Sequence, residues 1–176
     1  IAHAQTRRDS VLIALSLEPN SLDPTSAPAS ANAEVVHYNI LQGLTKIEQD
    51  GKTSPLLAEN WHTSADQQVW RFSLRRNVQF HDGSPFDAST VRWCFERAQQ
   101  ANSGNKGQNA LFDNVSAIET PDPHTVVLQL HHPDPHLLFR LGESYAVILH
   151  PKTAATAHSQ PIGTGPYRFE RWQRGQ

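Results

Sequence analysis

The sequence predicts a mixed α/β fold, with an α+β arrangement in which strands and helices follow one another along the chain. Three observations predict it. Short apolar or alternating runs of strand length recur between turn residues, residues 88–101 have helical spacing, and no internal repeat is present. The chain has 176 residues, 38% of them apolar and 18% charged. It is therefore long enough to bury a core, as one domain or a compact pair of lobes.

Charge balance and cysteine content exclude some function classes. The formal net charge is −2 with histidines neutral, whereas a nucleic-acid binder needs a basic face to neutralise phosphates. We therefore expect no nucleic-acid partner. Cys94 is the only cysteine, so an internal disulfide is impossible, and its apolar neighbours predict a small buried side chain rather than a nucleophile. No run approaches the roughly 20 apolar residues of a membrane span.

The first part of the chain predicts a strand, a loop, a helix and a second strand. Residues 11–17 are a short, almost continuous apolar run, which is typical of a buried strand, and Pro19 follows its end. Residues 31–44 place apolar side chains at helical spacing. Residues 45–48 then predict a strand that leads into a turn.

The middle of the chain predicts two strands and a capped helix. Residues 69–74 alternate apolar and polar side chains, as in a half-buried strand, and residues 77–80 predict a second short strand. Asp87 is well placed to cap a helix over residues 88–101. The buried stripe of that helix would be formed by Val91, Cys94, Phe95 and Ala98.

The last part of the chain predicts a loop, a hairpin and several short elements. Residues 102–109 are rich in Gly, Asn and Ser and predict an exposed loop, while residues 115–119 and 125–130 predict a hairpin. The remaining expected elements are a short helix at 134–141, a strand at 145–149, a helix that opens at Pro151 and a strand at 167–172.

The N-terminus predicts export. Ala2-His3-Ala4 followed by Gln5 has the small-x-small pattern that precedes a signal-peptidase cut. The charged and hydrophobic parts of a signal peptide would then lie upstream of this chain. We therefore expect an extracytoplasmic protein.

The motifs of common enzyme classes are missing from the sequence. It has no G-x-S-x-G elbow and no H-E-x-x-H pair, and Gly163-Thr164-Gly165 lacks the Lys-Ser/Thr ending of a phosphate loop. His81 and Asp82 are neighbours in a turn, an arrangement that rarely makes an acid–base pair. We expect a protein that is not an enzyme and that needs no cofactor.

Ten histidines raise the question of a metal site. His132 and His136 are four residues apart, but Pro133 and Pro135 oppose a regular helix between them, and no Glu is interposed as in a zincin. Scattered surface histidines explain the pattern better than a metal-ligating set.

Four segments then occur in a distinctive order. They are EPNSLDP at 18–24, PLLAENW at 55–61, WRFSLR at 70–75 leading to VQFHDGSPFDA at 78–88, and PIGTGPY at 161–167. Together they resemble solute-binding protein family 5, the peptide- and nickel-binding components of ABC importers. Most of these residues build a lobe. Trp61, Trp70 and Phe72 would anchor it, and Gly83 would make its tight turn.

This resemblance implies a periplasmic binding protein type II fold, in which two lobes close over a ligand. Residues 1–37 and 162–176 would belong to lobe I, and residues 38–161 would be an inserted subdomain of the same lobe. Family members are much longer than this chain, so the resemblance implies a truncated N-terminal portion that lacks the opposite lobe.

The implied function is capture of di- or oligopeptides in the periplasm and their delivery to the membrane permease of an ABC importer, by a monomeric binding protein. A nickel or metal-chelate binder of the same family, or the sensor domain of a regulator, are the alternatives. Ligands bind beyond the carboxyl ends of strands in open α/β sheets, and the loop after residues 11–17 occupies that place. The implied ligand-binding residues are Glu18, Pro19, Asn20, Gly163, Thr164, Gly165 and Tyr167.

Overall fold

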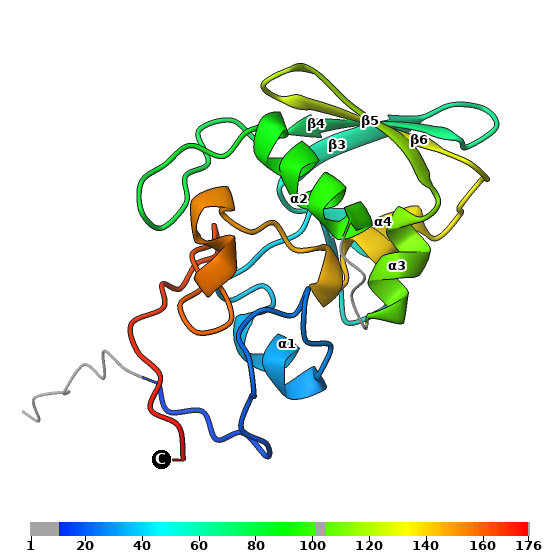
Figure 1. The fold of residues 1–176 in the computed structure, drawn as a ribbon. Helices are drawn as coiled ribbons and strands as arrows, with labels where there is room; N and C mark the ends of the chain where they lie inside the picture. Colours follow the sequence, from blue (N-terminus) through cyan, green and yellow to red (C-terminus); the bar gives the residue numbers. More distant parts are fainter. Residues whose placement is uncertain (1–10, 101–104, 176) are drawn as a thin grey trace, which may run out of the picture.

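The computed structural model describes residues 11–100 and 105–175 and has the mixed α/β architecture that the sequence predicts (Figure 1). Its largest unit is a four-stranded antiparallel sheet in the order β3-β4-β6-β5. A separate antiparallel ribbon joins β1 to β2. The strands are β1 (Thr45–Ile47), β2 (Thr53–Pro55), β3 (Ala58–Thr63), β4 (Val69–Leu74), β5 (Val115–Asp122) and β6 (Thr125–Leu130).

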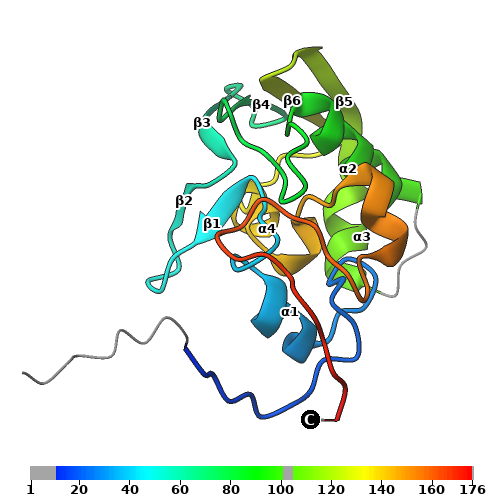
Figure 2. The same ribbon diagram turned by 90° about the vertical axis from the view of Figure 1, so that its left-hand side faces the viewer.

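Helices cover one face of the large sheet. Of them, α2 packs directly on β5 and β6, while α3 and α4 lie on the same side, and α1 is at the far end of the molecule (Figures 1 and 2). No helix in the described part of the chain is long and apolar enough to cross a membrane. The helices are α1 (Ser30–Val36), α2 (Ala88–Gln100), α3 (Lys106–Phe112) and α4 (Leu137–Leu141), with 3₁₀ turns η1 (Ser144–Ala146) and η2 (Pro151–Thr156).

The capped helix forms as predicted. Asp87 Oδ1 accepts a hydrogen bond from Thr90 N at 3.0 Å, which satisfies one of the free N–H groups at the start of α2. The apolar side chains predicted to form the buried face of α2 are buried, and so are Trp70 and Phe72 on β4. The aromatic residues of the second and third sequence segments therefore do build the core, with Trp61 packed partly against it.

The predicted hairpin and ribbon are also confirmed. Strands β5 and β6 pair antiparallel. In the ribbon, Gly51 makes the turn with φ of 81°, a conformation that favours glycine. Pro151 opens η2 at its first turn, where its missing N–H removes no hydrogen bond.

The prediction of a buried strand at residues 11–17 is wrong in this structure. These residues have no regular secondary structure and no strand partner, and their side chains are exposed, with Leu12 at 99% and Ile13 at 74%. A strand needs a partner for its N–H and C=O groups, and no described strand pairs with this run. The predicted leader at residues 2–5 lies outside the described residues.

Three other predicted strands do not form. Residues 77–80 are broken by Asn77 at φ of 59° and keep only an isolated bridge from Gln79 to Pro85. Residues 145–149 begin as η1 and continue as a buried extended segment whose Ile148 N donates to Gln42 O at 2.8 Å. Residues 167–172 join no ladder among the described strands.

Helix limits differ from the predictions at three places. The helix expected at 31–44 ends at Val36, because Tyr38 adopts a left-handed conformation (φ 62°). The helix expected at 134–141 begins only at Leu137. The loop expected at 102–109 gives way to α3 from Lys106, because the Asn105 side chain caps its N–H groups.

Candidate binding site

The loop that follows residues 11–17 is fixed by a buried side chain from α1. Asn32 has no exposed surface. Its Oδ1 accepts hydrogen bonds from Asn20 N at 3.1 Å and Ser21 N at 3.2 Å, and its Nδ2 donates to Asn20 Oδ1 at 3.0 Å and Ala27 O at 2.8 Å. Pro19 is buried beside it. The sequence prediction missed Asn32, although a polar residue inside the helical segment was the available signal.

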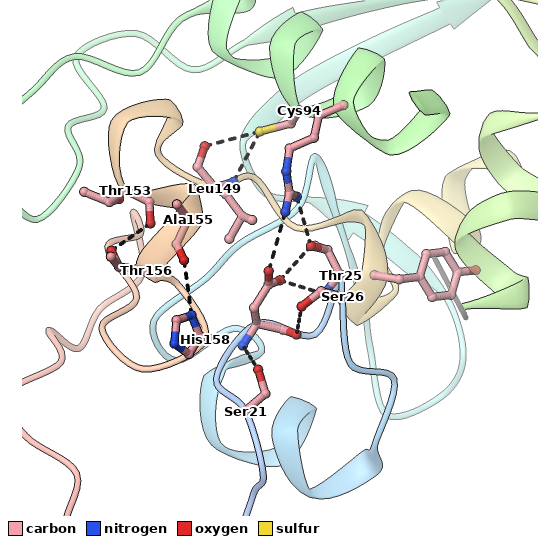
Figure 3. Close-up of polar contacts among 12 residues, drawn as sticks. Ser21, Thr25, Ser26, Cys94, Leu149, Thr153, Ala155, Thr156 and His158 are labelled. Carbon is pink, nitrogen blue, oxygen red and sulfur yellow. Dashed lines mark hydrogen bonds and ion pairs between the residues drawn. The ribbon is translucent and has the colours of Figure 1, made fainter. Parts of the chain in front are cut away.

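The far end of this loop is pinned to α2. Asp23, only 3% exposed, accepts hydrogen bonds from Thr25 N at 2.9 Å and Thr25 Oγ1 at 2.6 Å. Arg97 donates to Thr25 Oγ1 at 3.2 Å and lies 3.7 Å from Asp23 Oδ2 (Figure 3). Asp23 is the buried partner of this pair, and its carboxylate is satisfied by the hydrogen bonds from Thr25 as well as by the nearby guanidinium. The loop is therefore fixed at both ends.

Glu18 faces the last described residues of the chain. Its carboxylate accepts hydrogen bonds from Gly175 N at 3.0 Å and Trp172 Nε1 at 3.3 Å. Beside it, Arg174 Nη2 donates to Asn20 O at 3.3 Å and stacks over the Trp172 ring. The start of the loop and the last described segment thus run side by side (Figure 2).

A hollow of about 540 Å³ lies between these two segments. Glu18 is the acidic group in its lining and Arg171 the basic one, and most of the other side chains are apolar. Concave, mainly apolar surfaces with a few polar groups are typical of small-ligand sites. The lining residues are Ile13, Ala14, Leu15, Leu17, Glu18, Pro19, Leu22, Val35, Phe169, Arg171, Trp172, Gln173 and Gly175.

The second group of predicted site residues, Gly163-Thr164-Gly165, packs against the backbone of residues 39–40. Gly165 N donates to Ile40 O at 3.0 Å, and a Cβ at position 163 would lie 1.9 Å from that same oxygen. A Cβ at Gly165 would lie 2.3 Å from Asn39 O. Glycine is required at both positions, because the bend after α1 leaves no room for a Cβ.

Thr164 and Tyr167 complete this group. Thr164 Oγ1 donates to Gln42 Oε1 at 2.9 Å. Tyr167 N donates to Asn39 O at 3.0 Å, while the Tyr167 side chain is 66% exposed. None of these residues lines the hollow at Glu18. The predicted site residues therefore fall into two groups, and the structure brings only Glu18 and Pro19 to the hollow.

The bend that supports the glycines is held by Tyr38. Its hydroxyl donates to Gly142 O at 2.7 Å and accepts from Ile47 N at 2.8 Å, while its backbone N donates to Leu41 O at 2.9 Å. Burial raises the pKa of this phenol, so it stays protonated as a donor. Next to it, burial lowers the pKa of His37 to about 4, which keeps that ring neutral.

Cys94 is buried, as expected, and accepts Leu149 N at 3.3 Å (Figure 3). Burial raises the pKa of its thiol to about 12, so the reactive thiolate is scarce near neutrality. Among residues 11–100 and 105–175, no group of three or more His, Cys, Asp or Glu side chains is arranged to hold a metal ion.

Comparison with known proteins places this architecture in a class. Residues 52–176 match the family model described as bacterial extracellular solute-binding proteins, family 5 middle. The chain is 31% identical over its whole length to the probable D,D-dipeptide-binding periplasmic protein DdpA of Escherichia coli K12, of which it covers 36%. The chain therefore spans about a third of the length of the curated relatives it matches.

Solved structures of periplasmic binding proteins have the same fold as this chain. The periplasmic binding protein AgaA of A. tumefaciens R10, in complex with agropinic acid, superposes with a TM-score of 0.81 at 34% identity, over 90% of this chain and 32% of AgaA. NikZ of Campylobacter jejuni, in complex with Ni(L-His), gives a TM-score of 0.76 at 26% identity, over 90% of this chain and 32% of NikZ.

The fold is thus that of part of a periplasmic binding protein. Within that class, the chain belongs to family 5 of the bacterial extracellular solute-binding proteins.

Proposed function

We propose that this chain is part of a periplasmic substrate-binding protein that captures di- or oligopeptides and delivers them to the membrane permease of an ABC importer. The observation that carries the proposal is the family 5 match over residues 52–176. Family 5 proteins are transport binding proteins, and a role as an enzyme is not proposed. Export by an upstream signal peptide and a monomeric state belong to the same proposal.

The proposed lobe I consists of residues 1–37 and 162–176, and residues 38–161 form its inserted subdomain. The hydrogen bonds that Gly175 N donates to Glu18 and that Arg174 donates to Asn20 O support the first grouping, because they hold its two separate stretches side by side. The rest of the cleft wall would come from sequence beyond this third of the protein.

Glu18 is the proposed contact for a peptide amino terminus. Its carboxylate is exposed beside the hollow and already accepts an N–H from Gly175 and one from Trp172. A ligand ammonium would replace them with charge-assisted hydrogen bonds, which are stronger in a closed, dry site. Pro19 and Asn20 would contribute backbone groups, as in strand addition. Gly163, Thr164, Gly165 and Tyr167 are proposed as a second set of contacts.

A nickel or metal-chelate cargo is the second candidate. It is favoured by the likeness to NikZ, whose structure holds Ni(L-His). In such a cargo the chelator supplies ligands to the metal, so a peptide site and a chelate site would differ little in the part of the protein seen here.

Native mass spectrometry of the full-length protein purified from its host separates the candidates. A co-purifying di- to pentapeptide is the expected result. A bound mass that contains nickel would overturn the peptide proposal in favour of the chelate.

The role of Glu18 is tested by Glu18→Gln in the full-length protein, with Glu59→Gln on the exposed face of β3 as the matched control. Calorimetry with the identified peptide should give about 10- to 150-fold weaker binding for E18Q, because one charged hydrogen bond is worth about 1.5–3 kcal/mol. Equal affinity of E18Q and E59Q would remove Glu18 from the proposed site.

A further inference from the structure

His81 connects the turn before α2 to the glycine segment at 163–165. Its backbone N donates to Gly163 O at 2.9 Å. Its ring uses both nitrogens on the same segment, because Gly163 N lies 3.4 Å from Nδ1 and Gly165 O lies 2.8 Å from Nε2. One half-buried histidine thus holds three backbone groups of a segment more than 80 residues away.

The chemistry of these partners fixes the tautomer. A carbonyl oxygen only accepts, so Nε2 must carry the proton that reaches Gly165 O. A backbone N–H only donates, so Nδ1 must offer its lone pair to Gly163 N. The neutral ring with its proton on Nε2 is the one form of His81 that satisfies both contacts. A second proton would set an Nδ1–H group against the N–H of Gly163.

The other side of the turn is firmly held. Asp82 Oδ1 accepts from Ser84 N at 3.0 Å and Ser84 Oγ at 2.6 Å, and these bonds lower the pKa of the Asp82 carboxyl. His150, buried against Phe80, places Nε2 at 2.9 Å from Ser84 Oγ, while its Nδ1 accepts from Lys152 N at 3.2 Å. His81 therefore projects from a fixed base.

The segment that His81 grips has little freedom of its own. Gly163 and Gly165 lie so close to residues 39–40 that neither position has room for a Cβ. A small shift of the His81 ring would therefore displace Gly165 and distort the hydrogen bond that Gly165 N donates to Ile40 O.

We propose that His81 is a positioning residue that sets the register of Gly163-Thr164-Gly165 through its neutral Nε2–H form, and that protonation of its ring loosens this segment. The charged and titratable groups around the ring are Asp82 in its own turn, His150 behind that turn, and Arg168 and Glu170, which line the same hollow of about 480 Å³. The inference goes beyond the proposed transport function and does not depend on the cargo.

Nuclear magnetic resonance of the protein without cargo tests the proposal. At neutral pH, the nitrogen shifts of His81 should identify the Nε2–H tautomer. On acidification, the protection of the Gly163 and Gly165 amides relative to their intrinsic exchange rate at the same pH should fall about two- to tenfold, which corresponds to the loss of one hydrogen bond. The midpoint of that change should coincide with protonation of His81.

Two variants and a control complete the test. His81→Gln keeps an N–H donor for Gly165 O but does not titrate, so the protection of the two glycine amides should no longer depend on pH. In His81→Phe, which lacks both ring contacts, the two glycine amides should be weakly protected at both pH values. His62→Gln, at an exposed histidine on β3, should behave as the parent. An Nδ1–H tautomer, or an unchanged pH response in H81Q, would overturn the proposal, and both readouts remain if H81F fails to fold.

Discussion

At the scale of single residues, side-chain hydrogen bonds hold the segments that lie outside helices and strands. Asn32 fixes the loop after residues 11–17, and Tyr38 fixes the bend after α1. Buried polar atoms persist only when they are hydrogen bonded, so each of these residues has one acceptable orientation. This explains why loops without ladders still have defined geometry.

Gly163→Ala should destabilise the protein by about 3 kcal/mol or more, because the added Cβ would meet Ile40 O at 1.9 Å and backbone cannot yield as a flexible side chain does. The measurement is urea unfolding. Gly51→Ala is the control. Its added Cβ would meet nothing within 4 Å, so the only cost is the positive φ of that position, which should lower the free energy of unfolding by about 1 kcal/mol. Similar losses for both variants would contradict the close-packing explanation.

Asp87→Ala should lower the free energy of unfolding by about 1 kcal/mol through loss of the cap on α2. Burial alone would raise the pKa of Asp87, but hydrogen bonds from Ser89 and Thr90 outweigh it and lower the pKa. Because its pKa is lower in the folded state, ionised Asp87 stabilises the protein at pH values above its unfolded-state pKa of about 3.9. This stabilisation is lost as the pH falls through the folded-state pKa.

Asp87→Asn supplies the control for this pH effect, because Asn caps comparably but does not titrate. Urea unfolding at about pH 6 and about pH 3 should show that the parent loses more stability on acidification than D87N does. Equal losses would exclude Asp87 as a contributor.

At the scale of elements, prediction succeeded where a local pattern decides the structure. The alternation in β4, the cap and stripe of α2 and the hairpin of β5 and β6 are all local, and all form. Prediction failed at residues 11–17 and 167–172, because an apolar run becomes a strand only if another strand pairs with it. A partner distant in sequence leaves no trace in the run itself.

Phe72→Ala should destabilise the protein by about 3–5 kcal/mol. The Phe72 side chain has no exposed surface and packs against Trp61 and Trp70 in the core beneath β4. Arg71→Ala, one residue earlier on the exposed face of the same strand, should change the stability by less than about 0.5 kcal/mol. Thermal or urea unfolding measures both. Comparable losses would place Phe72 outside the core.

At the scale of the whole molecule, the sequence predicted the family but left the arrangement of the proposed site residues open. The resemblance located Glu18 and Pro19, which line the hollow, and the glycines, which do have a packing reason to be there. It could not place the two groups relative to each other. That relation depends on the bend at Tyr38 and on the path of residues 167–175, neither of which follows from a local pattern.

Residues 1–176 alone should bind cargo weakly or not at all. The hollow beside Glu18 is open, and the chain spans about a third of its relatives, whose family resemblance implies a ligand enclosed between two lobes. A ligand covered on one side keeps much of its surface in water and gains little from desolvated charge pairs. Calorimetry with the peptide that co-purifies with the full-length protein should therefore detect weak binding or none by this chain. Affinity equal to that of the full-length protein would mean that these residues form a complete site, with Glu18 in its wall.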